Sequence, residues 1–135
     1  MTAPRYRTLV HTADLRIAVW GSDEEGLIRN AIAAVVTVVL GRSPRLPARR
    51  WVALGRWPPD LPSRLVRGVN EALFRIYARN EVAVGFEGPA GRARIALATM
   101  PPAWHPQTEV KAATYHDLRP RRRAGRLAAC LTLDV

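Results

Sequence analysis

The amino-acid sequence predicts an α+β fold, specifically a two-layer α/β sandwich with a mostly antiparallel sheet and two amphipathic helices. Its 135 residues are enough for one domain, and we expect a single domain over residues 1–135. Hydrophobic residues make up 48% of the chain, which is typical of a folded protein rather than a disordered one. Strand-like segments come in runs, whereas a parallel doubly wound sheet needs strands and helices in regular alternation.

Two short strands and a helix are predicted first along the chain. Apolar residues alternate with others over 6–11 and again over 15–20, and Thr12-Ala13-Asp14 separates the two runs. The segment Ser22-Asp23-Glu24-Glu25 then predicts a capping box, with Ser22 as the N-cap of a helix that ends at Gly41. The apolar face of this helix consists of Leu27, Ile28, Ala31, Ile32, Val35, Val38 and Val39.

A second helix and five further strands are predicted from the remainder. An Arg- and Pro-rich loop over 42–50 leads into a short strand over 51–54. Asp60 or Ser63 can cap the helix that follows, whose apolar stripe is Leu61, Leu65, Val69, Ala72, Leu73, Ile76 and Tyr77. The later strands are expected over 81–86, 92–99, 110–116 and 126–134, with a hairpin turn over 88–91.

The charge of the chain is strongly positive, and nearly all of it comes from arginine. Twenty Arg, one Lys (Lys111) and eleven acidic residues give a net charge of +10. Such a surface attracts polyanions and could bring the protein close to RNA. The arginines are dispersed along the sequence, however, and no aromatic residues are interleaved with them as in a base-stacking platform. The coding bias of a GC-rich genome explains the preference for Arg equally well.

Several classes of protein are disfavoured by the sequence. The longest apolar run, over 31–40, is about half of the ~20 residues that span a bilayer, so no membrane association is expected. No apolar signal core follows Met1, which favours a cytoplasmic location. The single cysteine, Cys130, excludes an internal disulfide and is predicted to be a small core residue.

The last two residues offer a possible metal site made of oxygen ligands. The side-chain carboxylate of Asp134 and the α-carboxylate of Val135 are covalent neighbours, and the Asp14 turn could supply a third carboxylate. Adjacent anions repel, which is relieved by protonation, by Arg or by a hard cation. Calcium or magnesium suits such a pocket better than zinc does. The alternative is that Asp134 is a solvated residue, or one paired with an arginine.

Two His–Asp combinations could in principle form a catalytic dyad. His11 lies three residues before Asp14, and His116 is followed directly by Asp117. A hydrolase built on these side chains is therefore one possible function. A structural role is the more common one for such pairs, and the sequence contains no Gly-rich phosphate loop and no nucleophile elbow.

Three collinear motifs resemble those of the archease family, and the resemblance covers nearly the whole chain. They are His11-Thr12-Ala13-Asp14 at the first strand break, the segment EVKAATYH over 109–116, and Leu133-Asp134-Val135 at the end. The segment Asn70-Glu71-Ala72-Leu73-Phe74 also resembles the Asn-Glu-Leu-Leu segment of that family. Two segments depart from the family pattern: Arg67-Gly68 replaces an Asp-Trp pair, and the 99–105 loop lacks an acidic Gly-Glu segment.

The resemblance implies a protein cofactor without catalytic activity of its own. Archeases assist the GTP-dependent tRNA-splicing RNA ligase by promoting its guanylylation and its repeated turnover, so the implied partner is that ligase, with RNA reached indirectly through it. The implied metal ligands are Asp14, Asp134 and Val135, and the implied cation is calcium, with magnesium or manganese as alternatives. The residues implied in ligase activation are Lys111, His11, Glu109 and His116. A basic RNA-binding or chaperone-like module without a ligase partner is the alternative function.

Overall fold

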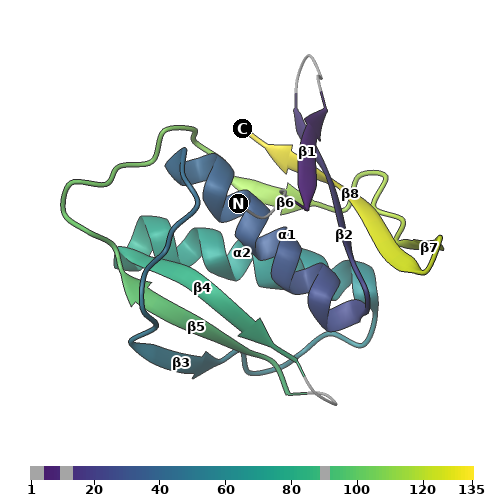
Figure 1. Ribbon diagram of the computed structural model, residues 1–135, viewed down its shortest axis with the longest axis horizontal. Coiled ribbons are helices and arrows are strands. Elements are labelled where there is room, and N and C mark those ends of the chain that lie inside the picture. The colour runs from purple at the N-terminus through teal and green to yellow at the C-terminus, as the bar shows by residue number, and fades with distance from the viewer. Residues whose placement is uncertain (1–4, 10–13, 89–91) are drawn as a thin grey trace.

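A computed structural model describes residues 5–9, 14–88 and 92–135 of the chain (Figure 1). The described residues form two helices and eight strands. In chain order these are β1 (Tyr6–Leu9), β2 (Leu15–Gly21), α1 (Glu24–Leu40), β3 (Arg50–Ala53), α2 (Leu61–Arg79), β4 (Glu81–Glu87), β5 (Arg94–Thr99), β6 (Ala112–Thr114), β7 (Arg121–Arg123) and β8 (Arg126–Asp134).

The strands divide into two antiparallel sheets that lie on different sides of the helices (Figure 1). The five-stranded sheet has the order β1-β2-β8-β6, and β7 also pairs with β8. The three-stranded sheet has the order β3-β5-β4. Helix α1 packs against α2 and contacts both β2 and β4. The predicted α+β class with antiparallel strands is therefore confirmed, whereas the division into two sheets was not visible in the sequence pattern.

Contact with both sheets explains why α1 is buried on more than one side. The predicted apolar face is present, but Ala34 and Val36, which lie outside that face, are also buried. Gly21 at the end of β2 allows the first turn of α1 to come very close: a Cβ on Gly21 would lie 2.5 Å from the Leu27 nitrogen. A side chain at position 21 would collide with backbone and is therefore not accommodated.

The N-cap of α1 differs from the prediction. Asp23, not Ser22, has the extended backbone of an N-cap, and its carboxylate accepts a 2.7 Å hydrogen bond from the Gly26 amide. Ser22 lies one residue outside the helix and is exposed. The sequence allowed either side chain to cap the first turn, since Ser and Asp are both favoured N-cap residues. The positive φ of Gly41 ends the helix as predicted.

Helix α2 begins where the sequence indicated and presents most of its predicted stripe to the core. Asp60 is the N-cap and accepts a 3.0 Å hydrogen bond from the Ser63 amide, which lowers the pKa of the Asp60 carboxyl. Tyr77 departs from the stripe because it is 45% exposed, although its hydroxyl accepts a hydrogen bond from the Val110 amide. The buried residues of the stripe are Leu65, Val69, Ala72, Leu73 and Ile76.

Two strand predictions require correction. The strand expected over 110–116 is limited to Ala112–Thr114. Strand β7 was not predicted at all, because three consecutive arginines show no alternation of apolar and polar residues. A turn at Ala124-Gly125, where both φ angles are positive, joins β7 to β8. The predicted turn over 88–91 lies largely outside the described residues.

Glu81 links three elements around the three-stranded sheet. Its carboxylate accepts hydrogen bonds from Arg50 of β3, at 3.0 and 3.1 Å, and from Arg75 of α2 at 3.3 Å. The hydrogen bond from Arg50 is the main cause that lowers the pKa of Glu81. Among the residues that the structure describes, no helix is long and apolar enough to cross a membrane.

Replacing the α1 cap separates the observed N-cap from the predicted one. Asp23→Ala removes the acceptor for the Gly26 amide and is expected to lower the free energy of unfolding by about 1 kcal/mol. Ser22→Ala is the matched control, and it is expected to change stability by less than about 0.5 kcal/mol. Urea unfolding of both variants is the measurement, and a larger loss for Ser22→Ala would contradict the assignment.

Candidate functional site

Pairing between β2 and β8 brings the first predicted carboxylate next to the last ones. The ladder runs from Gly21↔Leu127 to Leu15↔Leu133. Asp14 directly precedes Leu15 and Asp134 directly follows Leu133, so the two aspartates flank the last pair of this ladder. Directly opposite residues of an antiparallel pair present their side chains on the same face, typically with Cβ atoms about 4.5–5.5 Å apart. Asp14 is half-buried and Asp134 is exposed, and we call this end of the sheet the tip.

Lys111 is attached to the same tip through its main chain. Its amide donates a 2.7 Å hydrogen bond to the carbonyl oxygen of Asp134, and the next residue, Ala112, pairs with Asp134 in the ladder between β6 and β8. The Lys111 side chain is exposed. The structure therefore brings together Asp14, Lys111, Asp134 and the adjacent Val135, although they come from three separate regions of the sequence.

Two side chains of α2 hold the segment that carries Lys111. The Ala113 amide donates a 2.8 Å hydrogen bond to Asn70 Oδ1, and Asn70 Nδ2 donates a longer one, at 3.5 Å, to the Ala113 carbonyl. The Tyr77 hydroxyl accepts from the Val110 amide at 3.0 Å. Asn70 and Tyr77 thus fix residues 110–113 on both sides of Lys111. The role of Asn70 was not predicted, because nothing in the sequence indicates which backbone groups its side chain meets.

The other predicted activation residues lie around the tip or outside the described part of the chain. Glu109 is exposed, two residues before Lys111. His116 follows β6, and its carbonyl accepts a 3.2 Å hydrogen bond from the buried Thr132, which is two residues before Asp134. The His116 ring lies 3.2 Å from the Asp117 carboxylate, and both side chains are exposed. His11 lies outside the described residues.

The described side chains at the tip do not form a metal site. Within residues 5–9, 14–88 and 92–135, no three His, Cys, Asp or Glu side chains form a group that could hold a metal ion. Asp14 and Asp134 supply two carboxylate side chains at this end of the sheet. A set made only of carboxylate oxygens fits calcium, magnesium or manganese.

Packing explains one of the two departures from the archease pattern. Gly68 of α2 faces α1, where a Cβ would come within 3.3 Å of the Ile28 and Ile32 side chains. Arg67 is held by Glu71 at 2.6 Å and by the Leu54 carbonyl at 3.0 Å. The pair Arg67-Gly68 therefore stabilises the packing of α2 against its neighbours.

Cys130 requires a correction, because it is half-buried and lies outside the hydrophobic core. It pairs with Ala18 of β2, and both residues alternate with buried ones, so they lie on the face of the five-stranded sheet that is turned away from the helices. Residues 127–131 of β8 are all apolar, so the sequence pattern there did not indicate which of them face inward.

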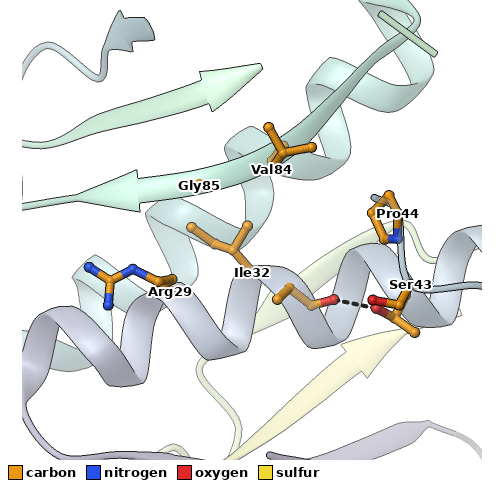
Figure 2. Close-up of a pocket in the computed structure, with 9 residues that line it drawn as sticks. Arg29, Ile32, Ser43, Pro44, Val84 and Gly85 are labelled. Carbon is orange, nitrogen blue, oxygen red and sulfur yellow. Dashed lines mark hydrogen bonds between the residues drawn. The ribbon is translucent and has the colours of Figure 1, made fainter. Parts of the chain in front are cut away.

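The described cavities lie elsewhere and offer little chemistry. One, of about 90 Å³, lies between α1 and β4 and is mostly apolar; Figure 2 labels Arg29, Ile32, Ser43, Pro44, Val84 and Gly85 on its walls. The other, of about 230 Å³, contains Glu24, Glu25 and Arg64. These groups already have partners, since Arg64 pairs with Glu24 at 3.0 Å and Glu25 accepts from the Gly88 amide at 2.6 Å.

Replacing Asn70 tests how the Lys111 segment is held. Asn70→Ala leaves the Ala113 amide and carbonyl without their side-chain partner, and we expect it to lower the free energy of unfolding by about 1–3 kcal/mol. Thr108→Ala, at an exposed position nearby, is the control and is expected to stay within about 0.5 kcal/mol of the original chain. Equal stability of the two variants in urea would contradict this role for Asn70.

Comparison with known proteins shows the family of the chain. A family model described as the archease protein family (MTH1598/TM1083) matches residues 6–135. The curated protein archease of Methanosarcina mazei is 29% identical over 141 residues, covering 97% of this chain and 96% of the relative.

Two solved structures share the fold. One is the crystal structure of a Thermotoga maritima archease, described as a possible chaperone, with a TM-score of 0.68 and 18% identity over 100% of this chain and 98% of its own. The other is the solution structure of protein 1598 of Methanobacterium thermoautotrophicum, with a TM-score of 0.71 and 22% identity over 98% of this chain and 100% of its own. Because the family model spans nearly the whole sequence, the chain belongs to the archease protein family.

Proposed function

We propose that this chain is a protein cofactor that activates a GTP-dependent tRNA-splicing RNA ligase, promoting guanylylation of the ligase and its multiple turnover. One observation supports the proposal: the Lys111 amide donates a hydrogen bond to the Asp134 carbonyl, so the segment over 109–116 and the end of β8 lie side by side. Membership of the archease family supports the choice of partner. The ligase would perform the chemistry, and this chain would be an activator rather than an enzyme.

Lys111 is the residue that we expect to act on the ligase. An ammonium group is a compact point charge, and it could offset phosphate charge while guanylate is transferred to the ligase. The Lys111 side chain is exposed, whereas its backbone is held by Asp134 and its neighbours are held by Asn70 and Tyr77. A charged group on a fixed backbone can be presented to a partner with little loss of conformational freedom.

Asp14, Asp134 and the Val135 carboxylate would hold a divalent cation, most suitably calcium, with magnesium or manganese as alternatives. When bound, the cation would neutralise carboxylates that otherwise repel one another. Asp14 directly precedes β2 and Asp134 is the last residue of β8, so their attachment to one cation would fix the beginning of β2 against the end of β8. His11, Glu109 and His116 would contribute to the surface that meets the ligase.

The location and the remaining partners follow from this role. The ligase acts on tRNA, so we propose that the chain works in the cytoplasm, reaches RNA through the ligase, and has no membrane partner. A basic RNA-binding or chaperone-like module without a ligase partner is the second candidate, and the description of the Thermotoga maritima protein as a possible chaperone favours its chaperone-like form. That alternative requires an effect on other proteins or on RNA when the ligase is absent.

Exchanging Lys111 for arginine tests whether a compact ammonium group is needed. Lys111→Arg keeps the charge but replaces a point charge by a planar, branched one, and we expect at least a tenfold loss in the rate of ligase guanylylation. The measurement is transfer of labelled guanylate to a ligase from the same organism, with divalent metal and without RNA.

Arg45→Lys is the matched control for this exchange, since it makes the reverse change at an exposed position in the loop after α1. It should leave guanylylation unchanged. Normal activation by Lys111→Arg would contradict the point-charge role, and no stimulation by the original chain would contradict the proposed function itself.

Removing a carboxylate tests the cation site directly. Asp134→Asn is expected to weaken calcium binding at least tenfold in titration calorimetry, because one anionic oxygen donor is lost from a set of three. Asp117→Asn makes the same change at an exposed site beside His116 and should leave calcium affinity unaltered. Equal affinities in the two variants would contradict the assignment of the site to the tip.

A further inference from the structure

The outward face of the five-stranded sheet carries arginines that are far apart in the sequence. Trp20 pairs with Ala128, and Ala18 pairs with Cys130. These four residues alternate with buried ones along β2 and β8, so they all lie on the outward face. Five arginines lie on the same face by register, and we call them the basic face: Arg7 opposite Ala18, Arg16 opposite Thr132, Arg121 opposite Ala128, and Arg123 opposite Arg126, which begins β8.

The acidic residues of the chain do not neutralise these arginines. Among the described residues, every Arg–Glu ion pair involves side chains of α1, α2 and the three-stranded sheet. No arginine of the basic face takes part in an ion pair with a described residue. The positive charge of the chain is therefore compensated around the three-stranded sheet and left uncompensated on the outward face of the other sheet.

Trp20 and several small residues surround the arginines of the basic face. The Arg126 guanidinium lies 4.9 Å from the centre of the Trp20 ring, which supports it on the sheet surface. Arg16 Nε is buried and has no hydrogen-bond partner among the described residues. Between the arginines lie the small residues Ala18, Ala128 and Cys130, all half-buried, so a chain of phosphates can approach the sheet closely.

We propose that the basic face binds the sugar–phosphate backbone of single-stranded RNA and directs the strand along the sheet toward the tip. Guanidinium groups bind phosphate through paired N–H donors. An arginine without an ion pair can do so without first breaking an existing contact. The face and the tip lie on one sheet, because Arg16 and Thr132 pair in the ladder two residues from Asp14 and Asp134. Thr132 is buried and Arg16 is half-buried, so the exposed arginines of the face are the remaining four.

The choice of RNA as the ligand of the basic face rests on the proposed function, because the proposed partner is an RNA ligase. An RNA strand that lies on the basic face would have its end close to Lys111 and the carboxylates. The chain would then contact the RNA of the ligase directly, in addition to contacting the ligase. The sequence alone pointed away from such a surface, since the arginines are dispersed and Trp20 is not interleaved with them.

A pair of double variants tests the basic face. Arg121→Ala combined with Arg126→Ala removes two charges from the face, while Arg45→Ala combined with Arg56→Ala removes two charges from exposed positions in the loops before and after β3. Binding of a fluorescent twelve-nucleotide single-stranded RNA is measured by anisotropy over a series of salt concentrations. Loss of two phosphate contacts should weaken binding at least tenfold and reduce the salt slope of log K by about 1.4, whereas the control pair keeps its slope.

Three results would overturn the assignment to RNA on this face: no RNA binding by the original chain at low salt, equal losses in both double variants, or equally strong competition by polyglutamate. The last would identify an acidic protein surface as the occupant. Guanylylation of the ligase without RNA is measured in parallel and should be normal in both double variants. A failure of RNA binding with normal guanylylation contradicts only the basic face, and a failure of guanylylation by the original chain contradicts the proposed function.

Discussion

Antiparallel pairing of β2 with β8 is the constraint on which the rest of the structure depends. It joins a strand near the beginning of the described chain to the last one, and it has seven paired positions, from Leu15↔Leu133 to Gly21↔Leu127. Its inward residues, including Ile17, Leu131 and Leu133, are fully buried in the core. A slip of one residue would turn every one of these side chains to solvent, so burial fixes the register. The same register brings the carboxylates together.

The local elements could be read from the sequence, because each depends on near neighbours. Both helices, the Asp60 cap and the strand over 126–134 are where the periodicity indicated. β7 could not be read, since its three arginines are stabilised by pairing with β8 and not by an alternating pattern. For the site, the resemblance to archeases implied Asp14, Lys111 and Asp134 as a set, whereas the tether from Asn70 depends on how α2 meets β6 and has no local signal.

Charge is divided between the two sheets in a way that net charge does not reveal. Glutamates of the helices and of β4 pair with nearby arginines. Some of these ion pairs connect different elements, as Glu81 does with Arg50 and Arg75. The five-stranded sheet instead carries arginines without described partners on one face and two neighbouring aspartates at its tip. The arginines lie along this face and the two aspartates lie at its end, so the charge changes from positive to negative along the direction of the strands. A polyanion that approaches this sheet is attracted by the arginines and repelled by the two aspartates.

The attachment of β6 to α2 also determines how this protein behaves toward copies of itself. A strand at the edge of a sheet normally exposes free amide and carbonyl groups, which can recruit a strand from another chain. Here Asn70 uses both main-chain groups of Ala113, and Tyr77 uses the amide of Val110. An incoming strand would have to displace these side chains before it could pair. Side chains of α2 thus protect this edge strand from pairing with another chain, as in domain swapping or fibrillar aggregation. Neither a proline nor a bulge is needed at this edge.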